Sequence, residues 1–153
     1  MTGLDDWKFL EGTWKARSAE ENTFGEEGYV EGEHVFKVDL GGKFVTGRER
    51  SYQGEREIHT ALSVLFYDEE ESLLRRKTFF SYGFVNNEVE IERDGSMVRF
   101  EIVMEPVPEF FKGTKWRSYL RKVSDDTVLD GLESSKDGIN YSLFGETILK
   151  RVK

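Results

Sequence analysis

The stretch FVNNEVEIERDGSMVRFEIVME, residues Phe84–Glu105, consists of two alternating segments on either side of Asp94-Gly95. Largely apolar side chains alternate with charged ones in both: Val85, Asn87, Val89 and Ile91 against Glu88, Glu90 and Glu92, then Val98, Phe100, Ile102 and Met104 against Arg99 and Glu101. Alternation with a period of two predicts strands that have one buried and one solvated face. Asp-Gly between two such segments favours a tight β-hairpin, because both turn residues then take a positive φ.

Similar segments fill the rest of the chain and predict about ten strands. The expected ranges are Thr13–Ser18, Tyr29–Leu40, Phe44–Gln53, Ile58–Asp68, Leu73–Tyr82, Phe84–Arg93, Met97–Glu105, Lys115–Ser124, Thr127–Ser135 and Asn140–Arg151. The one helix signal is Leu4–Leu10, where apolar residues recur every three positions. Since no helix connects parallel strands, we expect an all-β fold, an up-and-down antiparallel β-barrel of about ten strands with a short N-terminal helix.

The composition limits the other possibilities. The 153 residues contain no linker or repeat, so we expect a single domain over residues 1–153. The absence of cysteine excludes disulfides, thiol catalysis and zinc–thiolate sites. A formal charge of −8 disfavours nucleic-acid binding, because acidic surfaces repel phosphates. No apolar segment is long enough for a membrane span or a signal peptide, so we expect a cytoplasmic protein without a membrane partner. The many charges and the single glutamine are typical of thermophile proteins.

The segment Leu10-Glu11-Gly12-Thr13-Trp14 places Gly-x-Trp at the entry of the first strand. This opening resembles that of the calycins, the lipocalins and fatty-acid-binding proteins. Two further stretches, LGGKFVTG at Leu40–Gly47 and Phe66-Tyr67-Asp68, are similar to an uncharacterised bacterial and archaeal lipocalin-like family. The resemblance covers most of the chain and implies a barrel with an internal ligand cavity, in which Trp14 closes the base.

Nitrobindin-like haem barrels also open with Gly-Thr-Trp. That weaker resemblance implies a haem held by a histidine near the C-terminus, but residues 140–153 contain no histidine. We therefore expect no cofactor. The only histidines, His34 and His59, have no acidic residues at ligand spacing, so no metal site is expected either.

Three residues of the third expected strand, Arg48, Arg50 and Tyr52, lie on one face and are the leading candidates for a ligand anchor. If this face points inward, the guanidinium groups either pair with Glu133 or Glu146 or hold an anionic ligand head, as the resemblance to fatty-acid-binding proteins suggests. If it points outward, they are solvated surface residues. The alternation does not choose between these orientations.

Four more residues are candidate ligand contacts. His34 alternates with Phe36 and Val38 and is expected to face the interior, with His59 starting the fourth strand. Trp116 is expected in the core or the cavity wall, and Tyr141 completes the set. The loop pair Phe110 and Phe111 is expected to form a lid, a core contact or a homodimer contact, because exposed aromatic pairs are usually covered.

These observations favour non-catalytic binding of a small hydrophobic or amphipathic molecule with an anionic head. The first alternative is an enzyme that uses His34, His59 or Tyr52 for acid–base chemistry on a small hydrophobic substrate. The second is a solid-core interaction module, and a minor one is haem binding. The expected partners are a small amphipathic molecule and a second copy of the chain.

Overall fold

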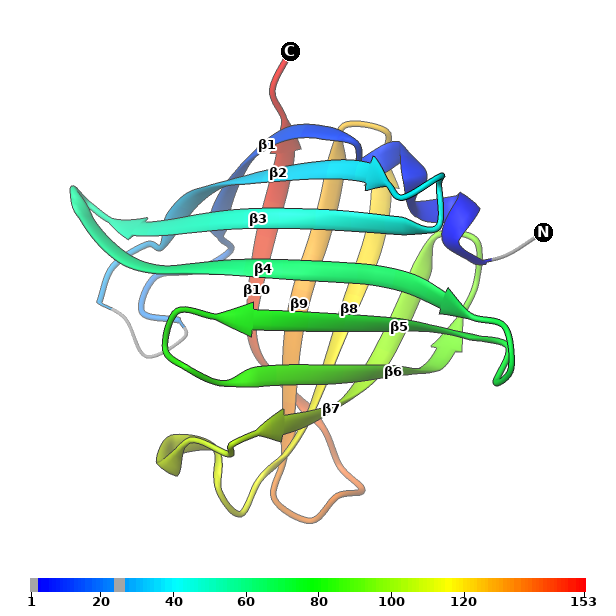
Figure 1. The fold of residues 1–153 in the computed structure, drawn as a ribbon. Helices are drawn as coiled ribbons and strands as arrows, with labels where there is room; N and C mark the ends of the chain where they lie inside the picture. The colour runs from blue at the N-terminus through cyan, green and yellow to red at the C-terminus, as the bar shows by residue number, and fades with distance from the viewer. Residues whose placement is uncertain (1–2, 24–26) are drawn as a thin grey trace.

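The computed structural model describes residues 3–23 and 27–153 and forms a closed antiparallel barrel of ten strands (Figure 1). The strands are β1 (Gly12–Ser18), β2 (Glu31–Asp39), β3 (Phe44–Gln53), β4 (Arg56–Asp68), β5 (Leu73–Phe80), β6 (Val85–Arg93), β7 (Met97–Glu105), β8 (Lys115–Ser124), β9 (Thr127–Ser135) and β10 (Ser142–Arg151). Two short 3-10 helices, η1 (Gly3–Leu10) and η2 (Glu109–Phe111), complete the elements. The expected all-β, up-and-down barrel is confirmed, and every strand end lies within two residues of its expected position.

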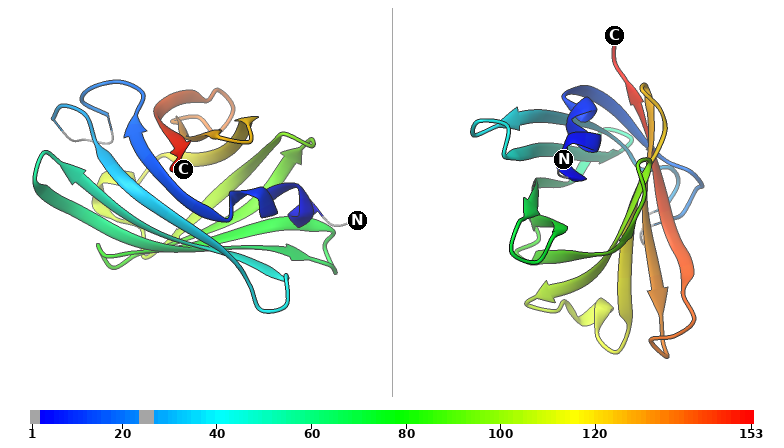
Figure 2. Two further views of the ribbon diagram at one scale, coloured as in Figure 1. Left: turned by 90° about the horizontal axis from the view of Figure 1, so that it is seen from above. Right: turned by 90° about the vertical axis from the view of Figure 1, so that its right-hand side faces the viewer.

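Each strand pairs with its neighbour in sequence, and β1 pairs with β10 to close the barrel (Figures 1 and 2). Arg151 strengthens this closure: its guanidinium donates to the carbonyls of Phe9 and Glu11 at 2.5 and 2.9 Å. The β6–β7 hairpin forms as expected, but neither Asp94 nor Gly95 takes a positive φ. Instead, the Asp94 carboxylate accepts hydrogen bonds from the backbone N–H and hydroxyl of Ser96 and so closes the turn.

Helix η1 packs against the inside of one barrel end. Its Leu4, Trp7 and Leu10 are buried, and their three-residue spacing matches the three residues per turn of a 3-10 helix. The indole Nε1 of Trp14 donates to the carbonyl of Leu10 at 2.8 Å, and the ring is fully buried, which confirms its expected place at the base. Within the described part of the chain, no helix is long and apolar enough to cross a membrane.

The inward-facing residues form an apolar layer at each end of the barrel. At the closed end, η1 and Trp14 pack with residues that include Val45, Leu74, Phe100 and Val128. Toward the other end, a smaller cluster is built on Ile102, Met104 and Trp116. The register places polar pairs between these layers, with His34 opposite Glu49 and Arg76 opposite Glu88 on neighbouring strands.

In strand β6 the charged face points inward and the apolar face points outward, the opposite of the usual arrangement. Alternation alone places the face of Val85, Val89 and Ile91 inward, whereas Glu88 is only 3% exposed and Ile91 is 43% exposed. The reason is the cross-strand partner: Glu88 points inward to meet Arg76 of β5, so the face of Asn86, Glu88 and Glu90 is the inner one as far as the β-bulge between Glu90 and Glu92. Strand β7 follows the rule, with Val98, Phe100, Ile102 and Met104 buried.

Candidate ligand-binding cavity

A cavity of about 480 Å³ lies within the barrel, which is the size of pocket that holds a small organic ligand. Six of the titratable residues in its walls are here called the polar belt: His34, Glu49, His59, Arg76, Glu88 and Asp130. Six of its aromatic lining residues are here called the aromatic mouth: Phe80, Tyr82, Phe84, Phe110, Phe111 and Phe144. This volume has room for several water molecules, so the barrel is not the solid-core module considered above.

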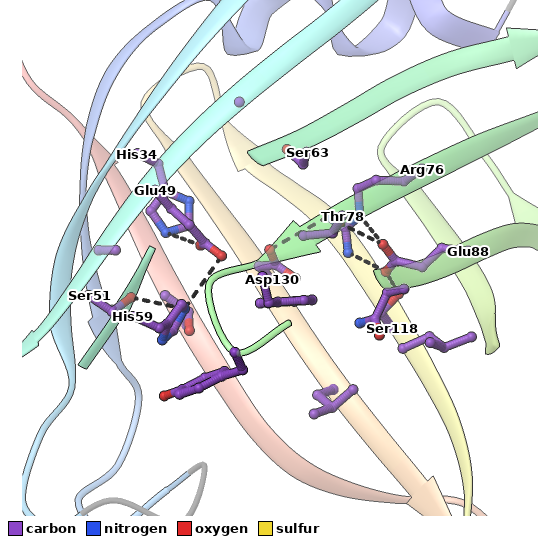
Figure 3. A pocket seen from close by; sticks show the side chains of 18 of the residues that line it. His34, Glu49, Ser51, His59, Ser63, Arg76, Thr78, Glu88, Ser118 and Asp130 are labelled. Atoms are coloured by element: carbon purple, nitrogen blue, oxygen red, sulfur yellow. Dashed lines mark hydrogen bonds and ion pairs between the residues drawn. The ribbon is translucent and has the colours of Figure 1, made fainter. Parts of the chain in front are cut away.

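One side of the polar belt is an ion pair between Arg76 and Glu88 (Figure 3). The guanidinium Nε and Nη2 donate to the two carboxylate oxygens at 3.0 and 2.8 Å, in the bidentate geometry that suits these two groups. The hydroxyls of Thr78 and Ser118 donate to the same carboxylate at 3.1 and 2.6 Å. Glu88 is thus held by four hydrogen bonds from two strands, β5 and β8, which offsets the cost of burying its charge.

The opposite side of the polar belt is a carboxylate between two histidines (Figure 3). The Oε2 atom of Glu49 lies 2.9 Å from Nε2 of His34, and its Oε1 lies 3.6 Å from Nε2 of His59. Burial alone would lower the pKa of His34, but the charge of Glu49 and the hydrogen bond to it raise that pKa above its usual value. Burial would raise the pKa of Glu49, but His34 and His59 together hold it well below its usual range.

Asp130, on the inner face of β9, lies between these two groups (Figure 3). Its Oδ2 is 3.6 Å from Nη1 of Arg76, which is an ion pair but longer than a hydrogen bond. About 29% of the side-chain surface remains accessible and faces the cavity. Burial in the barrel raises the pKa of Asp130, an effect that the charge of Arg76 opposes only in part.

The aromatic mouth is held together by ring contacts. Phe80 and Phe84 stack with centroids 4.7 Å apart, and Phe111 meets Trp116 edge-on at 4.8 Å. Phe110 is 66% exposed, yet its ring lies 6.0 Å from that of Phe144, and both line the cavity. Of the expected roles of Phe110 and Phe111, this placement favours a cover over the cavity.

Some of the predicted site residues line the cavity and others do not. His34 and His59 line the cavity, as expected for His34. Arg48 and Arg50 are exposed on the outer face of β3, because the inner face is formed by Val45, Gly47, Glu49 and Ser51. Of the two orientations that the alternation left open, these arginines take the outward one, which does not suit an anchor deep inside the barrel. Arg48 is nevertheless among the residues that line the cavity, whereas Arg50 does not line it and pairs with Glu57 at 3.7 Å.

The remaining predicted residues lie behind or outside the cavity wall. Trp116 is buried behind Phe111 and Phe144 and supports the aromatic mouth. Tyr141 is half-buried with the guanidinium of Arg117 3.7 Å from its ring centre, and neither residue lines the cavity. Tyr52 is half-buried and also lies outside the lining. Of the three acid–base residues of the enzyme alternative, the cavity therefore contains the two histidines.

Sequence reasoning missed Arg76, Glu88, Asp130 and Glu49. In β5 both faces carry charge and bulky apolar residues, so the alternation did not show that Arg76 points inward. Glu133 and Glu146, considered as partners for the β3 arginines, instead contact Arg99 and Tyr119. Within residues 3–23 and 27–153, no group of three or more histidine and acidic side chains is arranged to hold a metal ion.

Comparison with known proteins supports the architecture. The crystal structure of Rv2717c from M. tuberculosis matches with a TM-score of 0.71 at 16% identity, over 100% of this chain and 99% of that one. A redesigned β-barrel matches with a TM-score of 0.50 at 10% identity, over 95% of this chain and 93% of that one. By sequence, no protein-family model and no characterised protein matches the chain. At such identities the likeness shows the fold, and function rests on the site itself.

Proposed function

We propose that this barrel binds a small amphipathic molecule in its cavity without chemical conversion. The observation that carries the proposal is the arrangement of the lining, in which the polar belt and the aromatic mouth share one cavity of about 480 Å³. The polar head of the ligand would form hydrogen bonds with the polar belt in place of those it loses with water. The rest of the ligand would bury its apolar surface against the aromatic mouth. The calycin-like opening of the sequence agrees with such a role.

The head group is recognised by different residues from those first expected. Arg48 and Arg50, the residues expected to hold an anionic head, are both exposed on the outer face of β3. The arginine inside the cavity, Arg76, already donates two hydrogen bonds to Glu88 and faces Asp130. The binding proposal therefore rests on the polar belt as a whole and not on an arginine anchor.

Binding of an environment-sensitive hydrophobic dye tests whether the cavity takes a ligand. Leu132 of β9 lines the cavity and is half-buried, so Leu132→Trp places a bulky ring in the space that a ligand needs. Leu129 of the same strand faces outward, and Leu129→Trp is the matched control. We expect dye binding to wild type and to the control, and a loss of about tenfold or more in the Leu132→Trp variant. Equal dye affinity for all three proteins would contradict a ligand site in the cavity.

A further inference from the structure

The charges inside the cavity do not suit an anion. The polar belt contains three carboxylates, one arginine and two histidines. Its formal charge is −2 when both histidines are neutral and 0 when both are protonated, so it is not positive in any protonation state of the histidines. Glu31 and Arg48 also line the cavity but are exposed, and their opposite charges cancel. Because buried charges are poorly screened, a ligand that adds positive charge is favoured over one that adds negative charge.

The cavity wall also offers acceptors that lack donors. Glu88 accepts four hydrogen bonds, and Glu49 is shared by two histidines, so both carboxylates are already occupied. Asp130 has only the 3.6 Å ion pair with Arg76 among the described residues. The Oδ1 atom of Asn86, a buried residue of the same cavity, has no hydrogen-bond partner in the described part of the chain. Buried acceptors of this kind are costly unless a donor reaches them.

We propose that the ligand is a small hydrophobic amine whose ammonium group is held by the carboxylate of Asp130. This inference rests on the proposed cavity binding and specifies its ligand class. An ammonium group supplies donors that Asp130 lacks, and its charge offsets the excess negative charge of the polar belt. The aromatic mouth then contacts the apolar part of the ligand, and its ring faces also attract a cation on its way in.

The position of Asp130 makes it the available anchor. It lies between the Arg76–Glu88 pair and the His34–Glu49 pair, and its accessible surface faces the cavity (Figure 3). Because Arg76 stays at 3.6 Å, a ligand can approach Asp130 at hydrogen-bond distance without breaking an existing hydrogen bond. The carboxylates of Glu49 and Glu88 lie in the same cavity and add to the attraction for a cation.

Three probes with the same ring and different heads test the inference: naphthylethylamine, naphthylethanol and naphthylacetate. Each is titrated by competition with the bound dye, using wild type, Asp130→Asn and the control Glu133→Gln. Glu133 lies on the outer face of β9, where it pairs with Arg99 at 2.9 Å, so its substitution removes a carboxylate without touching the cavity. Naphthylethanol binding reports whether Asp130→Asn has kept the cavity intact.

We expect wild type to bind the amine about tenfold to a hundredfold more tightly than the alcohol, and the acetate most weakly. Asp130→Asn should abolish most of the preference for the amine and leave alcohol affinity unchanged, whereas Glu133→Gln should change neither. Equal affinity for amine and alcohol, tighter binding of the acetate, or an unchanged preference in Asp130→Asn would overturn the amine inference and leave cavity binding intact. If the dye binds and none of the probes does, the amine inference is also overturned; if the dye itself does not enter the cavity, the proposed function fails first.

Discussion

At the scale of single residues, the Arg76–Glu88 pair should be the most sensitive point of the interior. Arg76→Leu leaves the carboxylate of Glu88 buried without its cation, which should lower the free energy of unfolding by about 3–5 kcal/mol. Adding Glu88→Leu should recover part of this loss, because the buried carboxylate of Glu88 is then gone, while Asp130 still lacks its ion pair with Arg76. The neighbouring Arg75 pairs with Asp68 on the outer face, so Arg75→Leu should cost only about 0–1 kcal/mol. Urea denaturation of wild type and the three variants measures these differences, and similar losses for Arg75→Leu and Arg76→Leu would contradict the inward role of Arg76.

The His34–Glu49 pair, also at this scale, predicts a pH-dependent contribution to stability. The raised pKa of His34 means that its contribution is complete below its ordinary pKa of 6.5 and is lost as the pH rises through the raised value. The lowered pKa of Glu49 means that its contribution is complete above 4.5 and is lost as the pH falls through the lowered value. His34→Gln keeps a donor but cannot be protonated, so it should lower the free energy of unfolding by about 1–3 kcal/mol, most strongly between pH 4.5 and 6.5. Urea denaturation over a pH series measures this, and a difference that does not vary with pH would show that the pair is not charged.

At the scale of strands, Gly131 of β9 is required by the tyrosine beside it. A Cβ at this position would overlap the ring of Tyr119, which lies across the glycine and donates a hydrogen bond to Glu146 of β10. Gly131→Ala should therefore lower the free energy of unfolding by about 1–3 kcal/mol through overpacking. At Gly95 an added Cβ has nothing within 4 Å and φ is not positive, so Gly95→Ala should change stability by less than about 0.5 kcal/mol. Equal effects of the two substitutions in chemical denaturation would contradict the contact.

The strands also show what the sequence can and cannot predict. Their number, order and ends were predictable, because turn residues and period-two alternation are local signals. The inner face of β6 was not, because it depends on a partner that only the barrel register supplies, Arg76 opposite Glu88. The orientation of Arg48 and Arg50 was open for the same reason: it follows from Glu49 pointing inward to His34. Alternation in the sequence shows which residues share a face of a strand. Where both faces carry charged residues, pairing with side chains of neighbouring strands decides which face is buried.

At the scale of the whole molecule, six strands bring the polar belt together, with Asp130 of β9 among the others. The charges of Arg76 of β5, Glu49 of β3, His34 of β2 and Glu88 of β6 all interact electrostatically with the carboxyl group of Asp130. If an ammonium group binds there, it needs the ionised form, and burial raises the pKa of Asp130 above its ordinary value of 3.8. Affinity for naphthylethylamine should therefore fall as the pH is lowered, beginning above the range in which an exposed aspartate takes up a proton.

Protonation of His34 acts in the same direction, because it adds positive charge to the cavity, and two variants separate the contributions. Asp130→Asn should bind the amine weakly at every pH, with most of the pH dependence gone. His34→Gln should keep the fall that comes from Asp130 and lose the part that comes from the imidazole. Competition titrations of the amine and of neutral naphthylethanol between about pH 4 and pH 8 measure this, with the alcohol as the reference for any change in the cavity itself. A parallel fall for amine and alcohol would show that acid opens the barrel, whereas a fall confined to the amine would place its charge beside Asp130.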